Sequence, residues 1–304
     1  MEVAILGECM VELSQQPDGH YKMGFGGDTL NTAIYLSRCG GRCDYFTAIG
    51  DDLYSAQMKA EWQKEGVGVN HVITRAGANS GLYIIENDDH GERHFHYWRD
   101  TAPARELLTI APDIFTILMD YPLLFLTGIT LSIYSDADRE TLFAFLKRYR
   151  LNGGRVVFDN NYRPRNWHSQ ADAIHAYQSM MENTDIGLIS LEDEIALYGE
   201  HQVEACMERW ISKGVCELVV KNGEQGCTAY HQQQYVFVPL PNVVKPLDTT
   251  AAGDSFNGAY LAARMQGKPL ERCITDAQHC AGVVIMHKGA IIDKGIPLQP
   301  GDLA

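Results

Sequence analysis

The stretch "DTTAAGDSFNGAYLAAR", residues 248–264, joins a turn of small residues to a predicted helix. Apolar residues recur there at three- and four-residue intervals, from Phe256 to Ala263, which predicts a helix with one buried face. A helix N-terminus presents unpaired amides and the positive end of the helix dipole, which suits a phosphate. Because residues 251–253 have little or no side chain, a phosphate could closely approach the backbone at this turn.

Asp254 stands at the start of this helix and has two interpretations. A carboxylate repels a phosphate, so Asp254 is not a phosphate ligand. As a general base that takes a proton from an attacking hydroxyl, it would complete a site for phosphoryl transfer. Aspartate is also a preferred helix N-cap, and a cap alone would explain the residue. Spacing alone leaves both interpretations open.

The first hundred residues are predicted to be β-rich, with one helix among the strands. That helix follows "GFGGD", 24–28; Leu30, Ala33 and Ile34 lie on its apolar face, Asp28 could cap it, and Gly40–Gly41 stop it. The segment "GLYIIENDDHGERHFHYW", 81–98, has two runs of β-formers around a turn-rich hexapeptide, which predicts a hairpin.

From about residue 120 the pattern changes to that of a parallel sheet. Short apolar runs at 121–128, 154–161, 185–194 and 216–226 alternate with predicted helices, for example at 136–150 and 201–213. Continuous apolar strands between helices indicate βαβ units covered on both faces. We therefore expect an α/β fold in one domain, 1–304, with a small β lid formed by segments within about 12–27 and 80–100.

Composition limits the classes of partner. The 304 residues carry a formal net charge of -14, which argues against a nucleic-acid or anionic-membrane surface. The eight cysteines are scattered and form no C-x-x-C, as expected in a reducing compartment. The N-terminus "MEVAILGECM" has no basic region ahead of its apolar run, so it is predicted to be a strand and not a signal peptide. We expect a cytoplasmic protein.

Two motifs carry a resemblance to a known family. "DTTAAGDSF" resembles the D-T-x-G-A-G-D signature of the PfkB, or ribokinase-like, carbohydrate kinases, and "GFGGDTLNTAIYLSR" resembles their N-terminal Gly-Gly signature, about 220 residues earlier. The resemblance spans essentially the whole chain. It implies a ribokinase-like fold, in which helices flank a central, mostly parallel sheet with a small β-sheet lid, and it implies ATP and Mg²⁺ as cofactors.

Finer features point to one substrate class within that family. "IGECMVEL", "GERHFHYWR" and "FDNNYRPRNW" resemble family members that act on a sugar acid. The resemblance implies transfer of the ATP γ-phosphate to the 6-hydroxyl of 2-dehydro-3-deoxy-D-gluconate, giving 2-dehydro-3-deoxy-6-phospho-D-gluconate. A family kinase of fructose, ribose or a nucleoside is the nearest alternative. The chain lacks the acidic residue that would bind the ribose in a dinucleotide-binding oxidoreductase, which argues against that class. A non-catalytic sugar-binding protein would not need Asp254 as a base.

The resemblance also assigns residues to the two ligands. The predicted substrate residues are Gly27, Asp28, Asn31, Tyr83, Tyr97, Trp98, Arg99, Arg163 and Asp254. The predicted ATP residues are Asn161, Tyr162, Arg163, Lys221, Asn222, Gly223, Glu224, Gln225, Gly226, Ala251, Ala252, Gly253 and Asp254. Independently of the family, the planar fork of Arg99 suits a carboxylate, although a solvated arginine at a strand end would have the same sequence.

The chain departs from the family pattern in two places. Ala251 stands where the first glycine of G-A-G-D is usual, and we expect its methyl group to narrow the allowed backbone without closing the anion site. The N-x-x-E motif that orders the magnesium shell is absent; "SLEDE", 190–194, stands at its place. The metal-ligating residue among Glu192, Asp193 and Glu194 is left open.

The predicted lid also bears on assembly. An open sheet of this kind has free edges and an apolar face that usually need a cover. We therefore expect the chain to form a homo-oligomer through its lid.

Overall fold

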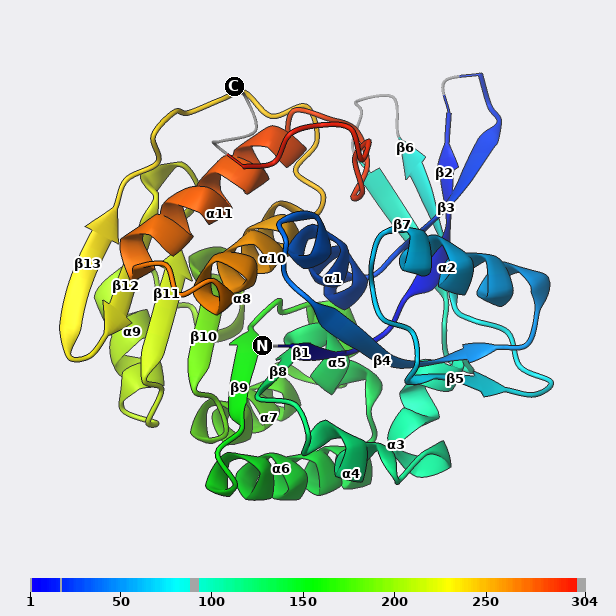
Figure 1. Cartoon of the computed structure of the whole chain (residues 1–304), viewed down its shortest axis with the longest axis horizontal. Coiled ribbons are helices and arrows are strands. Elements are labelled where there is room, and N and C mark those ends of the chain that lie inside the picture. Colours follow the sequence, from blue (N-terminus) through cyan, green and yellow to red (C-terminus); the bar gives the residue numbers. More distant parts are fainter. Residues whose placement is uncertain (1, 17, 88–92, 300–304) are drawn as a thin grey trace.

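A nine-stranded sheet forms the centre of the molecule (Figure 1). The computed structural model describes residues 2–16, 18–87 and 93–299. The strand order is β13-β12-β11-β10-β9-β8-β1-β4-β5. The pairs β11–β12 and β12–β13 are antiparallel, and the other neighbouring strands are parallel. These strands are β1 Val3–Leu6, β4 Cys43–Gly50, β5 Val72–Arg75, β8 Leu123–Thr127, β9 Arg155–Asp159, β10 Ile186–Ser190, β11 Glu217–Lys221, β12 Cys227–His231 and β13 Gln234–Val238.

Helices cover both faces of this sheet. Residues of α1, α10 and α11 share one buried cluster with one face, while residues of α6, α7 and α9 share another cluster with the opposite face. None of the described helices is long and apolar enough to cross a membrane. The α-helices are α1 Asp28–Arg38, α2 Leu53–Lys64, α3 Leu107–Ile110, α4 Ile114–Leu118, α5 Gly128–Ile133, α6 Asp136–Leu151, α7 Gln170–Glu182, α8 Leu191–Tyr198, α9 Val203–Ile211, α10 Ala252–Met265 and α11 Leu270–Val284; short 3₁₀ turns occupy Pro103–Glu106, Pro164–Asn166 and Gly223–Gln225.

A second sheet of four strands projects beside α1 and α2 (Figure 1). Its order is β3-β2-β6-β7, with β2 Met10–Gln15, β3 Tyr21–Gly26, β6 Leu82–Asn87 and β7 Arg93–Trp98. We call this sheet the lid. Most of the predicted turn of the β6–β7 hairpin, at 88–92, lies outside the described residues. Met10, Tyr83 and Ile85 form a small buried cluster on one lid face, which Phe95 and Tyr97 contact.

Three sequence predictions about elements need correction. A second helix, α2, interrupts the first hundred residues; it buries only Ser55, Met58 and Trp62, so its apolar periodicity is weak. Asp28 is not the cap of α1: the cap position is Gly27, and Asp28 is the first helical residue. The helix predicted at 201–213 spans the shorter range Val203–Ile211, and Ser212 is its C-cap.

Candidate active site

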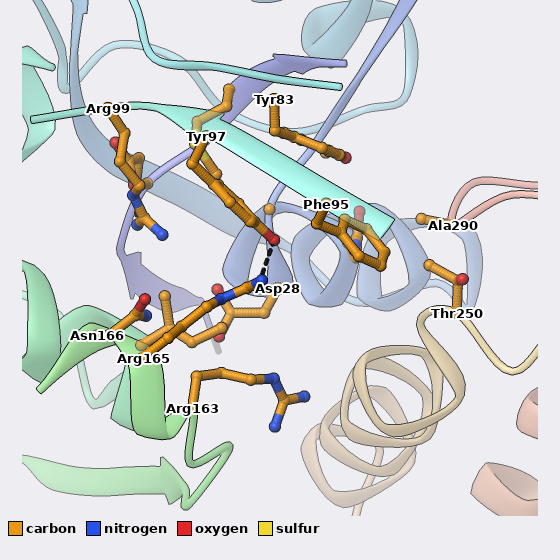
Figure 2. Close-up of a pocket in the computed structure, with 16 residues that line it drawn as sticks. Asp28, Tyr83, Phe95, Tyr97, Arg99, Arg163, Arg165, Asn166, Thr250 and Ala290 are labelled. Carbon is orange, nitrogen blue, oxygen red and sulfur yellow. Dashed lines mark hydrogen bonds and ion pairs between the residues drawn. The ribbon is translucent and has the colours of Figure 1, made fainter. Parts of the chain in front are cut away.

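Polar side chains gather where the parallel strands end, which is the usual ligand edge of such a sheet. Glu8 follows β1, Thr127 ends β8, Asn161 follows β9, and Lys221 ends β11. The lid lies over this edge and forms one side of a cavity of about 130 Å³ (Figure 2). The lining residues are Glu8, Met10, Gly26, Gly27, Asp28, Asn31, Tyr83, Phe95, Tyr97, Arg99, Ile129, Arg163, Arg165, Asn166, Thr250 and Ala290.

Close packing of α1 against α10 brings the two motifs of the sequence together. Gly258 makes this approach possible, because a Cβ atom there would lie 2.6 Å from the Leu36 amide nitrogen. At the contact, Asn31 Nδ2 donates to Asp254 Oδ2 over 2.8 Å. Asp254 does not itself line the cavity, but it accepts this hydrogen bond from Asn31, and Asn31 lines the cavity.

The environment of Asp254 disfavours its charged form. Burial is the main cause that raises the pKa of its carboxyl to about 8, and the nearby charge of Asp28 acts in the same direction. The hydrogen bond from Asn31 opposes this rise. The Oδ1 atom of Asn31 is buried without a partner among the described residues, so it remains available to a ligand hydroxyl.

Two neutral side chains donate hydrogen bonds to the carboxylate of Asp28. Thr127 Oγ1 donates to Asp28 Oδ2 over 2.5 Å, and Asn161 Nδ2 donates to the same atom over 2.7 Å. Burial raises the pKa of Asp28. The side-chain amide of Asn161, predicted to bind ATP, is therefore occupied by this carboxylate.

The start of α10 has the form of an anion site. Ala251 adopts a left-handed conformation, with φ of 60° and ψ of 18°, at the cap position of the helix. No backbone carbonyl of the described residues accepts a hydrogen bond from the amides of Gly253 or Asp254. Asp248 fixes the preceding turn, because its carboxylate accepts from the Thr250 amide over 3.0 Å and from the Gly289 amide over 2.6 Å. The exposed amides and the helix dipole together suit a phosphate.

Lys221 lies close to this helix start. A Cβ atom at Gly253 would be 3.7 Å from Lys221 Nζ. The ammonium group also contacts Asp159 Oδ1 at 3.4 Å and Asn257 Oδ1 at 3.2 Å. The predicted ATP residue Lys221 therefore adds a positive charge beside the free amides of α10.

Arg99, which is predicted to bind the substrate carboxylate, forms an ion pair within the protein. Its Nη2 atom forms a short ion pair with Glu8 Oε2. Glu8 is buried, with 2% exposure, and Arg99 is largely covered, with 11% exposure, so the alternative of a solvated arginine does not hold. Arg99 Nε and Glu8 Oε1 have no partner among the described residues. Both atoms retain hydrogen-bonding capacity for a ligand.

Lid tyrosines and a second arginine cover the cavity (Figure 2). Tyr83 donates to Glu12 in a short hydrogen bond and stacks on Tyr97 at 5.7 Å between ring centroids. Arg165 reaches from the body of the protein to the Tyr97 hydroxyl. Trp98 does not line the cavity and is 57% exposed, because strand alternation turns it to the opposite lid face. The prediction that Trp98 binds substrate does not fit this placement.

The acidic segment at α8 divides into three environments. Glu194 is fully buried and accepts hydrogen bonds from Arg209 and Trp210 of α9. Glu192 is exposed. Asp193 faces the site and pairs with Arg163 at 3.0 Å. Burial raises the pKa of Asp193 to about 6. Of the three candidates, Asp193 alone therefore contacts a residue that lines the cavity.

Tyr162 and the turn at 222–226, both predicted to contact ATP, do not line the cavity. The Tyr162 ring is buried in the core, edge-on to Tyr177 at 6.0 Å, so its side chain does not face the site. Residues 222–226 form the β11–β12 turn, closed by the Asn222 amide and the Gly226 carbonyl at 2.9 Å. They lie at the ligand edge of the sheet but do not line the cavity.

Sequence reasoning missed several cavity residues, and some had a usable signal. Phe95 alternates with Tyr97 along one strand, so period two would have selected it in place of Trp98. Glu8 lies two residues after the first apolar strand, in the region from which active-site residues project in α/β sheets. Ile129 and Ala290 are ordinary apolar residues, and no local pattern distinguishes them.

Comparisons with known proteins agree with this geometry. The family model described as pfkB family carbohydrate kinase matches residues 1–296. The chain is 42% identical to the 2-dehydro-3-deoxygluconokinase of Dickeya dadantii (95% of this chain, 96% of that protein) and 41% identical to the enzyme of the same name from Escherichia coli K12 (96% and 97%). A putative ribokinase II from E. coli, solved with ATP and Mg²⁺, has a TM-score of 0.82 at 23% identity and covers 95% of this chain, with 94% of its own chain covered.

The chain thus belongs to the pfkB family of carbohydrate kinases. The predicted family and the predicted ribokinase-like fold, with its small second sheet, are confirmed. The described residues contain no group of three or more His, Cys, Asp or Glu side chains that could hold a metal ion.

Proposed function

We propose that this pfkB-family kinase transfers the γ-phosphate of ATP to the 6-hydroxyl of 2-dehydro-3-deoxy-D-gluconate, giving 2-dehydro-3-deoxy-6-phospho-D-gluconate. Full-length relatives at 41–42% identity carry the name of that activity. The observation that carries the chemistry is Asp254, a carboxylate bonded to Asn31 at the start of α10, next to amides free to bind phosphate.

Each part of the site has a role in this reaction. Asp254, once ionised, accepts the proton of the 6-hydroxyl as that oxygen attacks the γ-phosphorus. The amides of Gly253 and Asp254 and the ammonium of Lys221 stabilise the charge on the transferring group. Asn31 orients Asp254 and has an oxygen free to accept a sugar hydroxyl. Together these groups position both reactants, which is most of what phosphoryl transfer requires.

The sugar acid fits the lid side of the cavity. Arg99 retains an unpartnered Nε donor, and Arg163 lines the same space. Gly27 allows the backbone after β1 to approach α1 closely, because a Cβ atom there would lie 2.2 Å from the Glu8 carbonyl oxygen. Asp28, Tyr83 and Tyr97 complete the acceptor side of the cavity. A carboxylate acceptor would use the guanidinium donors that a neutral sugar leaves unpaired.

ATP would lie along the turn at 221–226 and the start of α10, with its γ-phosphate at the amides of Gly253 and Asp254. Magnesium would be bound mainly by phosphate oxygens, and Asp193 and Asp159 are the carboxylates that could order its water shell. When bound, the ion neutralises charge on the phosphates. The eight cysteines, all among the described residues, form no disulfide. Because ATP and reduced thiols are typical of the cytoplasm, we place the reaction there.

A coupled ATP-magnesium assay with a panel of sugar acids and neutral sugars tests the substrate. We expect kcat/KM for 2-dehydro-3-deoxy-D-gluconate to exceed that for D-fructose or D-ribose by at least about a hundredfold, the size of one or two lost charged hydrogen bonds. Phosphorus NMR of the product should place the phosphate on C6. Faster turnover of a neutral sugar would contradict the proposal.

We also propose that the outer lid face associates with the same face of a second copy. The strand register places Leu13, Met23, Ile84 and Trp98 on this face, opposite the cavity. Met23 is 47% exposed and Trp98 57% exposed, an uncovered apolar surface on an open sheet. Light scattering should report a dimer, and Met23→Lys should shift it toward monomer. A monomeric wild-type chain at micromolar concentration would contradict this.

A further inference from the structure

Three arginines line the cavity, and their charges are balanced differently. Arg99 pairs with Glu8, and Arg163 pairs with Asp193. Arg165 has no carboxylate partner among the described residues. Its guanidinium instead donates to the Tyr97 hydroxyl and stacks 4.2 Å from the Tyr97 ring centroid. Arg165 is therefore the cavity arginine whose charge no protein carboxylate offsets.

Its position places that charge where an acceptor must bind. Arg165 belongs to the 3₁₀ turn after β9, on the body of the protein, and reaches across the cavity to the lid strand β7. In Figure 2 it lies between Tyr97 above and Arg163 below, with Asp28 behind it. Its side chain also lies 5.9 Å from the Phe95 ring centroid. Among the described residues, its guanidinium has one hydrogen-bond acceptor, the neutral Tyr97 hydroxyl, and two ring contacts, all of which a ligand could share or replace.

The anionic acceptor needs such a cation. Two carboxylates, Glu8 and Asp28, line the same cavity and would repel the carboxylate of a sugar acid. Arg99 can still donate a hydrogen bond, but Glu8 already offsets its charge. A planar guanidinium without a carboxylate partner can bind a carboxylate through two parallel hydrogen bonds.

We propose that Arg165 is a specificity-determining residue that binds the carboxylate of the acceptor, exchanging the Tyr97 hydroxyl for the substrate. This inference rests on the proposed sugar-acid kinase activity and adds the residue that balances the charge of its substrate. The aromatic rings of the lid remain stacked on the guanidinium, so the same side chain links the bound acceptor to the closed lid.

Steady-state kinetics of the full-length enzyme with two acceptors tests this. Arg165→Gln should lower kcat/KM for 2-dehydro-3-deoxy-D-gluconate about ten- to a hundredfold, mainly through KM, and lower that for D-fructose less than about threefold. Arg165→Lys should recover part of the loss, because it keeps the charge without the fork. The matched control is Arg148→Gln, an exposed arginine near the Phe145 ring on α6 and far from the cavity, which should change neither value.

The outcomes separate the inference from the activity on which it rests. If the wild-type enzyme prefers the sugar acid and Arg165→Gln keeps that preference, Arg165 does not read the carboxylate and the kinase proposal stands. Equal losses for both acceptors would mean that Arg165 only holds the lid to the body, and Tyr97→Phe should then show the same equal losses. A wild-type enzyme without preference for the acid overturns both proposals.

Discussion

The α10 end and the lid end of the active site differ in how their buried carboxylates are compensated. At the α10 end, burial and the charges of Asp28 and Asp159 raise the pKa of Asp254, and neutral amides and hydroxyls are the main hydrogen-bond donors to these three carboxylates. At the lid end, buried Glu8 is paired with Arg99. The first arrangement stores unfavourable charge, whereas the second cancels it.

This difference indicates which end performs chemistry. A carboxylate held against its own ionisation is a stronger proton acceptor, and crowding of this kind is typical of catalytic groups. In the Glu8–Arg99 pair, burial raises the pKa of Glu8, the charge of Arg99 opposes that rise, and the pair fixes the shape and hydrogen-bonding pattern of the pocket. We therefore propose that the reaction step takes place at the α10 end and that the lid end selects the acceptor.

The largest effect is expected at the base. Asp254→Asn keeps the shape and the hydrogen bond from Asn31 but cannot accept the proton, so kcat should fall roughly 10²–10⁴-fold. ATP affinity, measured by equilibrium titration, should change little. Near-normal turnover in this variant would show that Asp254 only supports the helix start.

Breaking the ion pair should have the next largest effect, and on folding. Arg99→Ala leaves Glu8 buried without its partner, so the free energy of unfolding in urea should fall by about 3–5 kcal/mol. Adding Glu8→Gln removes the stranded charge and should recover at least half of that loss. If the double variant is no more stable than Arg99→Ala alone, the stability lost on removing Arg99 comes from packing and not from the unpaired charge of Glu8.

The pH profile compares the two ends in one experiment. Asp254 must be ionised to act, and its pKa is raised to about 8. Below that pH, kcat/KM for the acceptor should rise about tenfold per pH unit as pH increases, and it should level off above it. Circular dichroism at each pH confirms that the chain stays folded. A flat profile between pH 5.5 and 9 would contradict the crowded-carboxylate interpretation.

The smallest effect concerns stability at the α10 end. In the unfolded chain the Asp254 carboxyl has its ordinary pKa of 3.8, and in the folded chain that pKa is raised. The folded state therefore binds more protons, so this group lowers stability progressively as pH rises from about 4 to 8. Asp254→Asn should be more stable than wild type by at least about 1 kcal/mol at pH 8 and by much less at pH 4. Thermal unfolding at both pH values measures this difference.

Much of the fold could be predicted because it depends on local patterns. The fully buried strands β1 and β8 are apolar throughout except for Thr127 at the end of β8, and the helix start at Asp254 has its small residues in order. The pairing of Arg99 with Glu8 could not be predicted, since it joins residues 91 positions apart through the lid geometry. The orientation of the Tyr162 side chain could not be predicted either, because an aromatic ring after a strand can point into the core or toward a ligand.

The contact between α1 and α10 also determines when the enzyme becomes active during its synthesis. The Asn31–Asp254 hydrogen bond spans 223 residues, so the base is positioned only after nearly the whole chain has left the ribosome. Helices and hairpins of the first half can form earlier from local contacts, whereas contacts between distant segments form slowly. A nascent chain can therefore assemble the part of its cavity lining that precedes α10, up to Asn166, before it acquires the carboxylate that we propose as the base, and ATP turnover would wait until the fold is nearly complete.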